Sequence, residues 1–155
     1  MEKAPMKELN TFFVYGTLRP GEVRFSLIEP YLLAPPVAAT LYGAHLYTTG
    51  PWPFVVNLPE TTAEIVGELV GIKEEHLARI LRLLDSMEGY RERDPNNSLF
   101  LRTVQPVYVP AGYPVEDGYV QAYVYTGGFS LTREAMDGGY TRITSGNWKD
   151  RVHEW

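Results

Sequence analysis

The segment FFVYGTLRPGE, Phe12–Glu22, gives the first indication of the fold, because an aromatic and β-branched run changes abruptly into a loop. The run is typical of a buried strand, and we expect that strand to span residues 11–16. Two glycines and one proline then follow within six residues. A plain reversal of the chain needs fewer such residues, so the loop Tyr15–Gly21 is a candidate for a second role.

Further strands are predicted wherever β-branched, aromatic and small apolar residues run between turn residues. These strand segments are residues 37–50, interrupted at Gly43, and residues 54–58, 63–72, 98–109 and 118–127, with loops at 90–98 and 110–118. A short helix is expected over 22–33, ended or kinked by Pro30, and a helical turn over 131–139. The pattern predicts one α+β domain over residues 1–155, with a small mixed, strongly curved sheet or β-barrel and a few flanking helices.

The charge and the cysteine content argue against several kinds of partner and site. With 14 basic and 19 acidic side chains the net charge is −5, which disfavours binding to nucleic acid or to an anionic membrane surface. The chain has no cysteine, so it lacks disulfides, a thiolate nucleophile and a cysteine-based zinc site. Its histidines, His45, His76 and His153, have no metal-ligand spacing, so we expect no metal.

No targeting segment is evident in the sequence. Residues 1–10 contain no apolar run of the length of a signal peptide, and no stretch has the length needed to span a bilayer. We therefore expect a cytoplasmic protein.

Residues 73–88, KEEHLARILRLLDSME, predict a helix with an apolar stripe and a clear end. Apolar side chains recur at the i, i+3, i+4 and i+7 spacing, at Leu77, Ile80, Leu81 and Leu84. Gly89 follows directly and suits the left-handed conformation that ends many helices.

Glu88 is anomalous, because it extends the apolar stripe of this helix instead of lying on the solvent face. It also lies in the last turn, where the helix dipole disfavours a negative charge, and Asp85 is expected to add like-charge repulsion. Burial, dipole and repulsion all predict a raised pKa, which suits a carboxyl group that takes and returns a proton. The alternative from spacing alone is a solvated glutamate at a fraying helix end.

The Tyr15–Gly21 loop offers a complementary feature. We expect its backbone N–H groups at Gly16, Thr17 and Leu18 to converge on a carboxylate or a developing oxyanion, with Gly16 allowing close approach to the ligand. The alternative is a tight turn that leads into a helix. The loop lacks the Gly-Lys-Ser/Thr ending of a P-loop and does not match a G-x-G-x-x-G dinucleotide site.

Four motifs occur in an order typical of one family: VYGTLR at Val14–Arg19, LYTTGPWPFVV at Leu46–Val56, LDSMEGY at Leu84–Tyr90 and ITSGNW at Ile143–Trp148. With these motifs the chain resembles the γ-glutamylcyclotransferase-like superfamily over most of residues 12–148. It is most similar to the branch of γ-glutamylamine cyclotransferases and AIG2-like proteins. The resemblance implies a small β-barrel with flanking helices, and an enzyme that releases the γ-glutamyl group of a small-molecule substrate as 5-oxoproline. It implies no metal and no organic cofactor.

The resemblance also implies roles for particular residues. The catalytic glutamate of the family corresponds to Glu88, which acts as general acid and base. The substrate-binding loop of the family corresponds to Tyr15, Gly16, Thr17 and Leu18.

Further candidates lie near these motifs. Arg19 and Arg102 are candidates for contact with a substrate carboxylate, and the alternative for both is a solvated surface position. Tyr125 is a candidate for lining the pocket, with packing in the sheet as the simpler role. Trp52 is expected to anchor packing or to form part of the pocket rim. Phe100 stands where the family often has a tyrosine, so the resemblance implies one lost hydroxyl contact.

Two alternatives to a cyclotransferase acting on free γ-glutamyl amines or amino acids stay open. One is a non-catalytic module of the same fold that binds a small molecule, in which Glu88 pairs with an ammonium group of the ligand. The other is an enzyme of the same chemistry that removes a γ-glutamyl group from a bulkier acceptor, protein-linked or in an antibiotic pathway.

Overall fold

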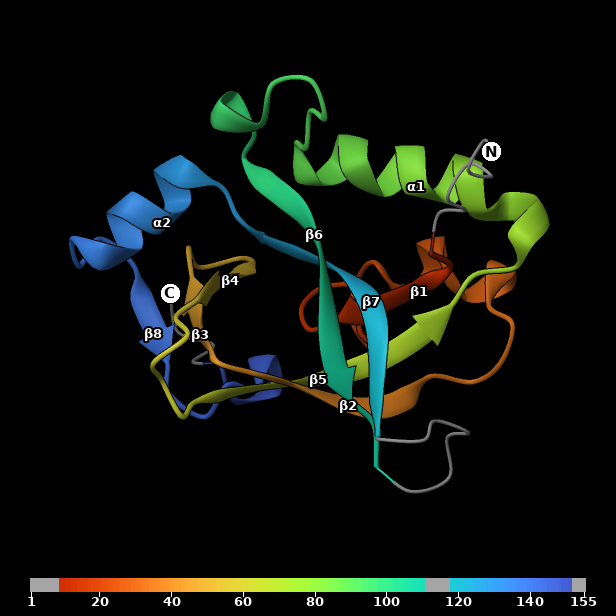
Figure 1. Ribbon diagram of the computed structural model, residues 1–155, viewed down its shortest axis with the longest axis horizontal. Helices are drawn as coiled ribbons and strands as arrows, with labels where there is room; N and C mark the ends of the chain where they lie inside the picture. The colour runs from red at the N-terminus through yellow and green to blue at the C-terminus, as the bar shows by residue number, and fades with distance from the viewer. Residues whose placement is uncertain (1–8, 111–117, 152–155) are drawn as a thin grey trace, which may run out of the picture.

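The computed structural model describes residues 9–110 and 118–151, which form a closed β-barrel with a smaller sheet beside it (Figure 1). The strands are β1 (Thr11–Val14), β2 (Val37–Tyr42), β3 (Ala44–Thr48), β4 (Pro53–Asn57), β5 (Glu64–Gly71), β6 (Phe100–Tyr108), β7 (Tyr119–Gly127) and β8 (Thr141–Ile143). The α-helices are α1 (Glu74–Glu88) and α2 (Phe129–Met136), and the 3₁₀ helices are η1 (Phe25–Leu27), η2 (Glu29–Tyr31), η3 (Pro95–Asn97) and η4 (Trp148–Asp150).

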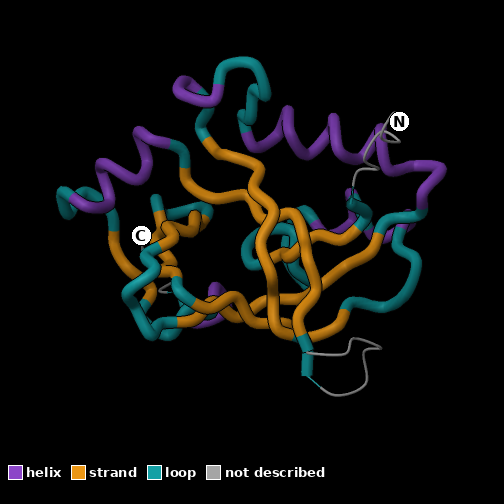
Figure 2. The backbone as a smooth tube through the Cα atoms, in the orientation of Figure 1, coloured by secondary structure: helices purple, strands orange, loops and turns teal. Residues whose placement is uncertain are grey.

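The barrel has the strand order β1-β5-β2-β6-β7, and β4-β3-β8 form the separate three-stranded sheet. It closes because β1 pairs with β5 on one side and with β7 on the other. The β1–β7 pair is parallel, with Phe12 opposite Tyr123, whereas the other barrel pairs are antiparallel. The predicted α+β fold with a mixed barrel is thus confirmed, and Figure 2 shows the strands at the centre with the helices around them.

Successive side chains of β1 point to opposite faces of the strand, so β1 contributes to two hydrophobic clusters. Phe12 and Val14 pack in one cluster with the apolar stripe of α1, while Phe13 lies in a second cluster that also contains Leu69 and Trp148. All four members of the predicted stripe on α1 are buried. β1 therefore joins α1 to the barrel, and the end of β1 and the end of α1 meet at one cavity.

The predicted end of α1 is confirmed in detail. Gly89 adopts a left-handed conformation with φ of 67°, and its N–H points to the carbonyl oxygens of Asp85 and Ser86. The helix therefore stops directly after Glu88, which fixes this residue in the last helical turn.

The prediction of a single helix over residues 22–33 was wrong. The short 3₁₀ helices η1 and η2 occupy this segment, and Pro30 lies in the first turn of η2. Proline has no N–H with which to continue an α-helical ladder, so the segment breaks into separate turns. The chain also folds back before η1, because the Arg24 N–H donates to the Thr17 carbonyl at 2.8 Å.

The structure also contains short elements that the sequence did not indicate. β8 and η4 were not predicted, since three residues each are too few for a periodic signal. The loop predicted at 110–118 lies outside the described residues over 111–117. Within the described part of the chain, no helix combines the length and the apolar character needed to cross a membrane.

Candidate active site

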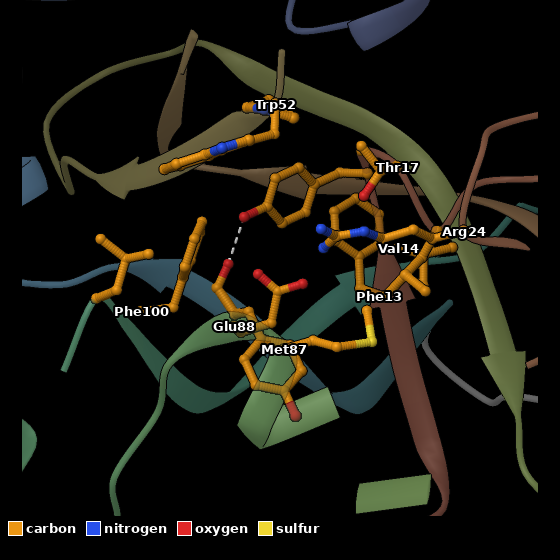
Figure 3. A pocket seen from close by; sticks show the side chains of 14 residues that line it. Phe13, Val14, Thr17, Arg24, Trp52, Met87, Glu88 and Phe100 are labelled. Atoms are coloured by element: carbon orange, nitrogen blue, oxygen red, sulfur yellow. Dashed lines mark hydrogen bonds between the residues drawn. The ribbon is translucent and has the colours of Figure 1, made fainter. Parts of the chain in front are cut away.

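A cavity of about 650 Å³, its open mouth included, lies where β1 and α1 end (Figure 3). Its walls come from the loop after β1, the last turn of α1, the start of β4, the start of β6 and one residue of β7. The lining residues are Phe13, Val14, Tyr15, Gly16, Thr17, Leu18, Arg24, Trp52, Pro53, Met87, Glu88, Leu99, Phe100 and Tyr125. The structure thus brings the predicted loop, the predicted glutamate and the predicted tyrosine of β7 to one place.

Glu88 projects from the last turn of α1 into this cavity. Its carboxyl group lies between Arg24 on one side and Phe100 and Trp52 on the other (Figure 3). Burial raises the pKa of Glu88 to about 6, and the positive charge of Arg24 acts in the opposite direction. Both protonation states are therefore accessible near neutral pH, as acid–base catalysis requires.

The prediction that Asp85 raises the pKa of Glu88 by like-charge repulsion was wrong. The Asp85 carboxylate accepts one hydrogen bond from the Tyr125 hydroxyl at 2.6 Å and another from Arg102 Nη1 at 2.5 Å. Its charge is therefore paired with Arg102, and burial is the main cause of the raised pKa of Glu88. Asp85 connects the end of α1 to β6 and β7.

Tyr15 is a buried, neutral part of the cavity wall. Its hydroxyl donates to the Tyr125 carbonyl at 2.5 Å, drawn as the dashed line in Figure 3. Burial raises the pKa of Tyr15 well above its ordinary value, and the negative charge of Glu88 raises it further. The phenol therefore stays protonated at neutral pH, and its proton is already engaged by a carbonyl group.

The loop Gly16–Leu18 lines the cavity, and its backbone N–H groups have no acceptor in the described chain. The carbonyl groups of Gly16 and Thr17 accept from the N–H groups of Arg19 and Arg24, at 3.1 and 2.8 Å. The N–H groups of Gly16, Thr17 and Leu18 have no acceptor among the residues that the structure describes. All three residues line the cavity, so these donors are free to meet an anionic group of a ligand.

Gly16 lines the cavity and also packs closely on Pro53. A Cβ at this position would lie 2.7 Å from Cγ and 3.0 Å from Cδ of Pro53. The glycine thus lets the loop pack on the start of β4, a contact that the sequence did not predict.

These features agree with the comparisons with known proteins. A sequence model of the family described as gamma-glutamyl cyclotransferase, AIG2-like, matches residues 12–150. The chain belongs to this family. Against curated proteins the sequence has no match.

Solved structures share the fold of this AIG2-like chain. An AIG2-like protein from Mus musculus is 24% identical with a TM-score of 0.56, and the match covers 77% of this chain and 78% of that one. YkqA from Bacillus subtilis is 24% identical with a TM-score of 0.60, and the match covers 92% of this chain but 40% of YkqA. A structure named gamma-glutamyl cyclotransferase is 13% identical with a TM-score of 0.51, and 87% of this chain and 70% of that one are covered.

Arg19 does not line the cavity of this AIG2-like chain. Its buried guanidinium binds both carboxylate oxygens of Glu68, each at 2.8 Å, and the side-chain oxygen of Asn147 at 2.7 Å. Gly146 beside it accepts the Val66 N–H at 2.9 Å. The ITSGNW motif thus contacts the loop after β1 through Asn147 and β5 through Gly146.

Arg102 also lies outside the set of cavity-lining residues. Its guanidinium pairs with Asp85 and lies 5.0 Å from the ring of Tyr123 and 5.3 Å from the ring of Tyr90. Tyr125 does line the cavity, but its hydroxyl is directed to Asp85. Arg102 therefore stabilises the end of α1 through its ion pair with Asp85, outside the cavity.

Sequence reasoning missed Arg24, which is half-buried in the cavity wall. No periodic pattern indicates it, because a turn of the chain, held by the backbone bond from Arg24 to Thr17, places it beside the loop. Trp52 and Phe100 form the opposite wall, with ring centroids 5.5 Å apart. Among the described residues, no three His, Asp or Glu side chains gather in a metal-binding arrangement, and His153 lies outside them.

Proposed function

We propose that this chain is a γ-glutamylcyclotransferase-type enzyme that releases 5-oxoproline from a γ-glutamyl amine or γ-glutamyl amino acid, with Glu88 as general acid and base. One observation carries the proposal. A carboxyl group with a pKa raised to about 6 projects into a cavity whose wall includes backbone N–H donors without a protein acceptor in the described chain. Membership of the AIG2-like family supports the same class of reaction.

The reaction begins at the α-ammonium group of the substrate. Glu88 is mostly ionised at neutral pH, since its pKa is about 6, and takes one proton from this group. The neutral amine then attacks the γ-carbonyl carbon of the same molecule. The cavity accelerates this step by holding the glutamyl chain in a folded conformation.

The second half of the reaction breaks the amide bond. The C–N bond to the acceptor breaks as the five-membered ring is completed, and Glu88 returns a proton to the leaving nitrogen. An alkyl amine leaves as an ammonium ion, so both protons that the α-ammonium loses end on the leaving amine. No water is consumed, and no oxidant or reductant is required.

Arg24 and the loop donors divide the binding of negative charge between them. Arg24 supplies a full positive charge for the permanent α-carboxylate of the glutamyl group. The N–H groups of Gly16, Thr17 and Leu18 suit the transient oxyanion on the γ-carbonyl oxygen. Figure 3 shows Arg24 and Thr17 on the same side of the cavity, which leaves the side of Trp52 and Phe100 for the acceptor.

The first test is the substitution Glu88→Gln, which keeps the shape of the side chain and removes its acid–base function. We expect the kcat for 5-oxoproline release to fall by ~10²–10⁴-fold, with the fold retained. The measurement is 5-oxoproline release from γ-glutamyl amines, γ-glutamyl amino acids and glutathione. Glu75→Gln, on the exposed first turn of α1, is the matched control and is expected to keep wild-type activity.

Two outcomes would redirect the proposal. Release by Glu88→Gln at the wild-type rate would remove Glu88 from the mechanism. A wild-type protein that binds γ-glutamyl ligands but releases no 5-oxoproline would support the non-catalytic binding module instead.

A further inference from the structure

We propose that Tyr125 is a positioning residue for the proposed reaction, and that it holds Glu88 and the loop Tyr15–Leu18 at a fixed separation. Its side chain binds the helix that carries Glu88, and its main chain binds the loop. The inference rests on the proposed function and goes beyond it, because it assigns a role to a residue that does not itself react.

The side chain of Tyr125 is attached to α1 about one turn before Glu88. Its hydroxyl donates to Asp85 Oδ1 at 2.6 Å. Burial raises the pKa of Tyr125, and so does this bond, so the phenol keeps its proton at neutral pH. Arg102 lies directly opposite Tyr125 in the β6–β7 pair and binds the other carboxylate oxygen of Asp85 at 2.5 Å. Asp85 is therefore held from two neighbouring strands.

The position of Asp85 fixes the turn that contains Glu88. The main-chain carbonyl of Asp85 accepts the Tyr90 N–H at 2.9 Å, so Glu88 lies inside a turn that is closed by this bond. A shift of the turn would move the Glu88 carboxyl within the cavity. A displacement of about 1 Å between reacting groups is enough to slow a reaction by ~10²-fold, so such a shift is expected to be costly.

The main chain of Tyr125 is attached to the loop after β1. Its carbonyl accepts from the Tyr15 hydroxyl at 2.5 Å (Figure 3). Tyr15 directly precedes Gly16, the first of the proposed oxyanion donors. Both tyrosines are buried. One residue of β7 thus connects the acid–base group to the donors, although these come from separate segments of the chain.

Tyr125→Phe tests the inference, because it removes the hydroxyl and keeps both the ring and the carbonyl that Tyr15 binds. The assay uses the γ-glutamyl compound from which the wild type releases 5-oxoproline fastest. We expect kcat to fall by ~10–100-fold, because Glu88 loses its position. We expect KM to change by less than ~3-fold, because the hydroxyl is bound to Asp85 and not to the substrate.

Tyr123→Phe is the matched control. Tyr123 lies two residues away on β7 and is 7% exposed, as Tyr125 is. Its hydroxyl accepts the Leu9 N–H, and the residue lies outside the set that lines the cavity. We expect this variant to keep the wild-type kcat.

A double variant tests whether Tyr125 acts through Asp85. Asp85→Ala removes the partner of the hydroxyl, and we expect it to lower kcat as well. Adding Tyr125→Phe to Asp85→Ala should then have little further effect, because the bond is already lost. Losses that multiply in the double variant would show that the hydroxyl acts by another route, and would overturn the inference.

The ionisation of Glu88 provides a readout that does not depend on turnover. Burial raises its pKa to about 6, and the charge of Arg24 opposes this. Tyr15 and Tyr125, the other titratable groups of the cavity wall, have raised pKa values and stay neutral. Asp85, on the same helix, is already neutralised by its ion pair. Burial, and with it the position of the side chain, therefore controls this pKa.

A ¹³C NMR titration of the Glu88 carboxyl group measures the pKa directly. In Tyr125→Phe the end of α1 is no longer held by the hydroxyl, so we expect the carboxyl to gain water and its pKa to fall from about 6 towards 4.5. Tyr123→Phe is expected to leave the pKa unchanged. A pKa that stays at about 6 in Tyr125→Phe would show that Glu88 has not moved, and would overturn the inference.

The remaining outcomes separate this inference from the proposed function. A wild-type kcat in Tyr125→Phe would overturn the inference and leave the cyclotransferase proposal standing. A raised KM with an unchanged kcat would show that the hydroxyl binds the substrate directly, and would also overturn it. A wild type that releases no 5-oxoproline, together with a lowered Glu88 pKa in Tyr125→Phe alone, would overturn the proposed function and support the positioning of Glu88 by Tyr125.

Discussion

At the scale of single residues, Glu88 is subject to two opposing effects. Burial raises its pKa from 4.5 to about 6, while the charge of Arg24 acts to lower it. The apolar spacing on α1 predicted the burial, because Glu88 continues the stripe of Leu77, Leu81 and Leu84. It did not predict Arg24, which comes from a separate segment of the chain. A sequence pattern thus places a side chain on a face, whereas its charged neighbours depend on the tertiary fold.

The raised pKa of Glu88 makes the folded protein less stable as the pH rises. Below pH 4.5 the group is protonated in both the folded and the unfolded state, and above about pH 6 both are ionised. Between these values only the folded state keeps the proton, so this contribution to the free energy of unfolding falls by ~2 kcal/mol as the pH rises. In Glu88→Gln this loss is absent.

Urea unfolding of both proteins across this pH range measures the effect. We expect Glu88→Gln to gain up to ~2 kcal/mol in free energy of unfolding relative to the wild type between pH 4.5 and above pH 6. A constant difference across the range would show that Glu88 has an ordinary pKa in the folded state. The same ionisation should give kcat/KM an acidic limb with an apparent pKa near 6.

At the scale of elements, the helix and most strands could be predicted because their side chains repeat. The stripe of α1, its end at Gly89 and the break between β2 and β3 at Gly43 are local signals. The prediction for residues 22–33 failed because their apolar residues resemble a helical pattern, while Pro30 prevents a continuous ladder of helical hydrogen bonds. The role of Asp85 could not be predicted either, because its hydrogen-bond partners lie on β6 and β7.

The loop after β1 provides a prediction at this scale. In Gly16→Ala the new Cβ would lie 2.7 Å from the Pro53 ring, a rigid neighbour, so the loop or the start of β4 must move. We expect a loss of ~1–3 kcal/mol in the free energy of unfolding and weaker substrate binding. Urea unfolding and KM measure the two effects.

Gly71→Ala is the matched control for this substitution. Gly71 also lies outside the positive-φ region, and a Cβ there would meet Leu33 Cδ1 at 3.5 Å, an ordinary contact. We expect it to change stability little. Equal effects of the two alanines would show that the contact with Pro53 does not restrict the loop.

At the scale of the whole molecule, Arg19 joins distant parts of the chain. It connects the loop after β1 with Glu68 on β5 and with Asn147, which is 128 residues away in sequence. The sequence marked Arg19 as a ligand contact or a surface residue, and neither pattern nor spacing indicates a partner so distant. Long-range polar partners of this kind are the part of the fold that local sequence patterns cannot specify.

Arg19→Met is expected to destabilise the protein by ~3–5 kcal/mol, because it leaves Glu68 without its partner at a largely buried site. Arg151→Met removes an ion pair in which the arginine is 22% exposed, against 4% for Arg19, and Glu22 keeps a hydrogen bond from the Trp148 indole N–H, so we expect a smaller loss. Urea unfolding compares the two. Similar losses would contradict a special role for Arg19, and a double variant with Glu68→Leu should recover much of the stability.

The parallel pairing of β1 with β7 has a consequence for the order of assembly. Phe12 meets Tyr123, so the barrel closes only when residues more than 100 positions apart have found each other. Contacts of such large sequence separation carry a high entropic cost and favour slow folding. During synthesis, the loop after β1 and the helix that ends in Glu88 both emerge before β7 does. Glu88 and the proposed oxyanion donors therefore exist on the nascent chain before the wall that Tyr125 contributes has been made.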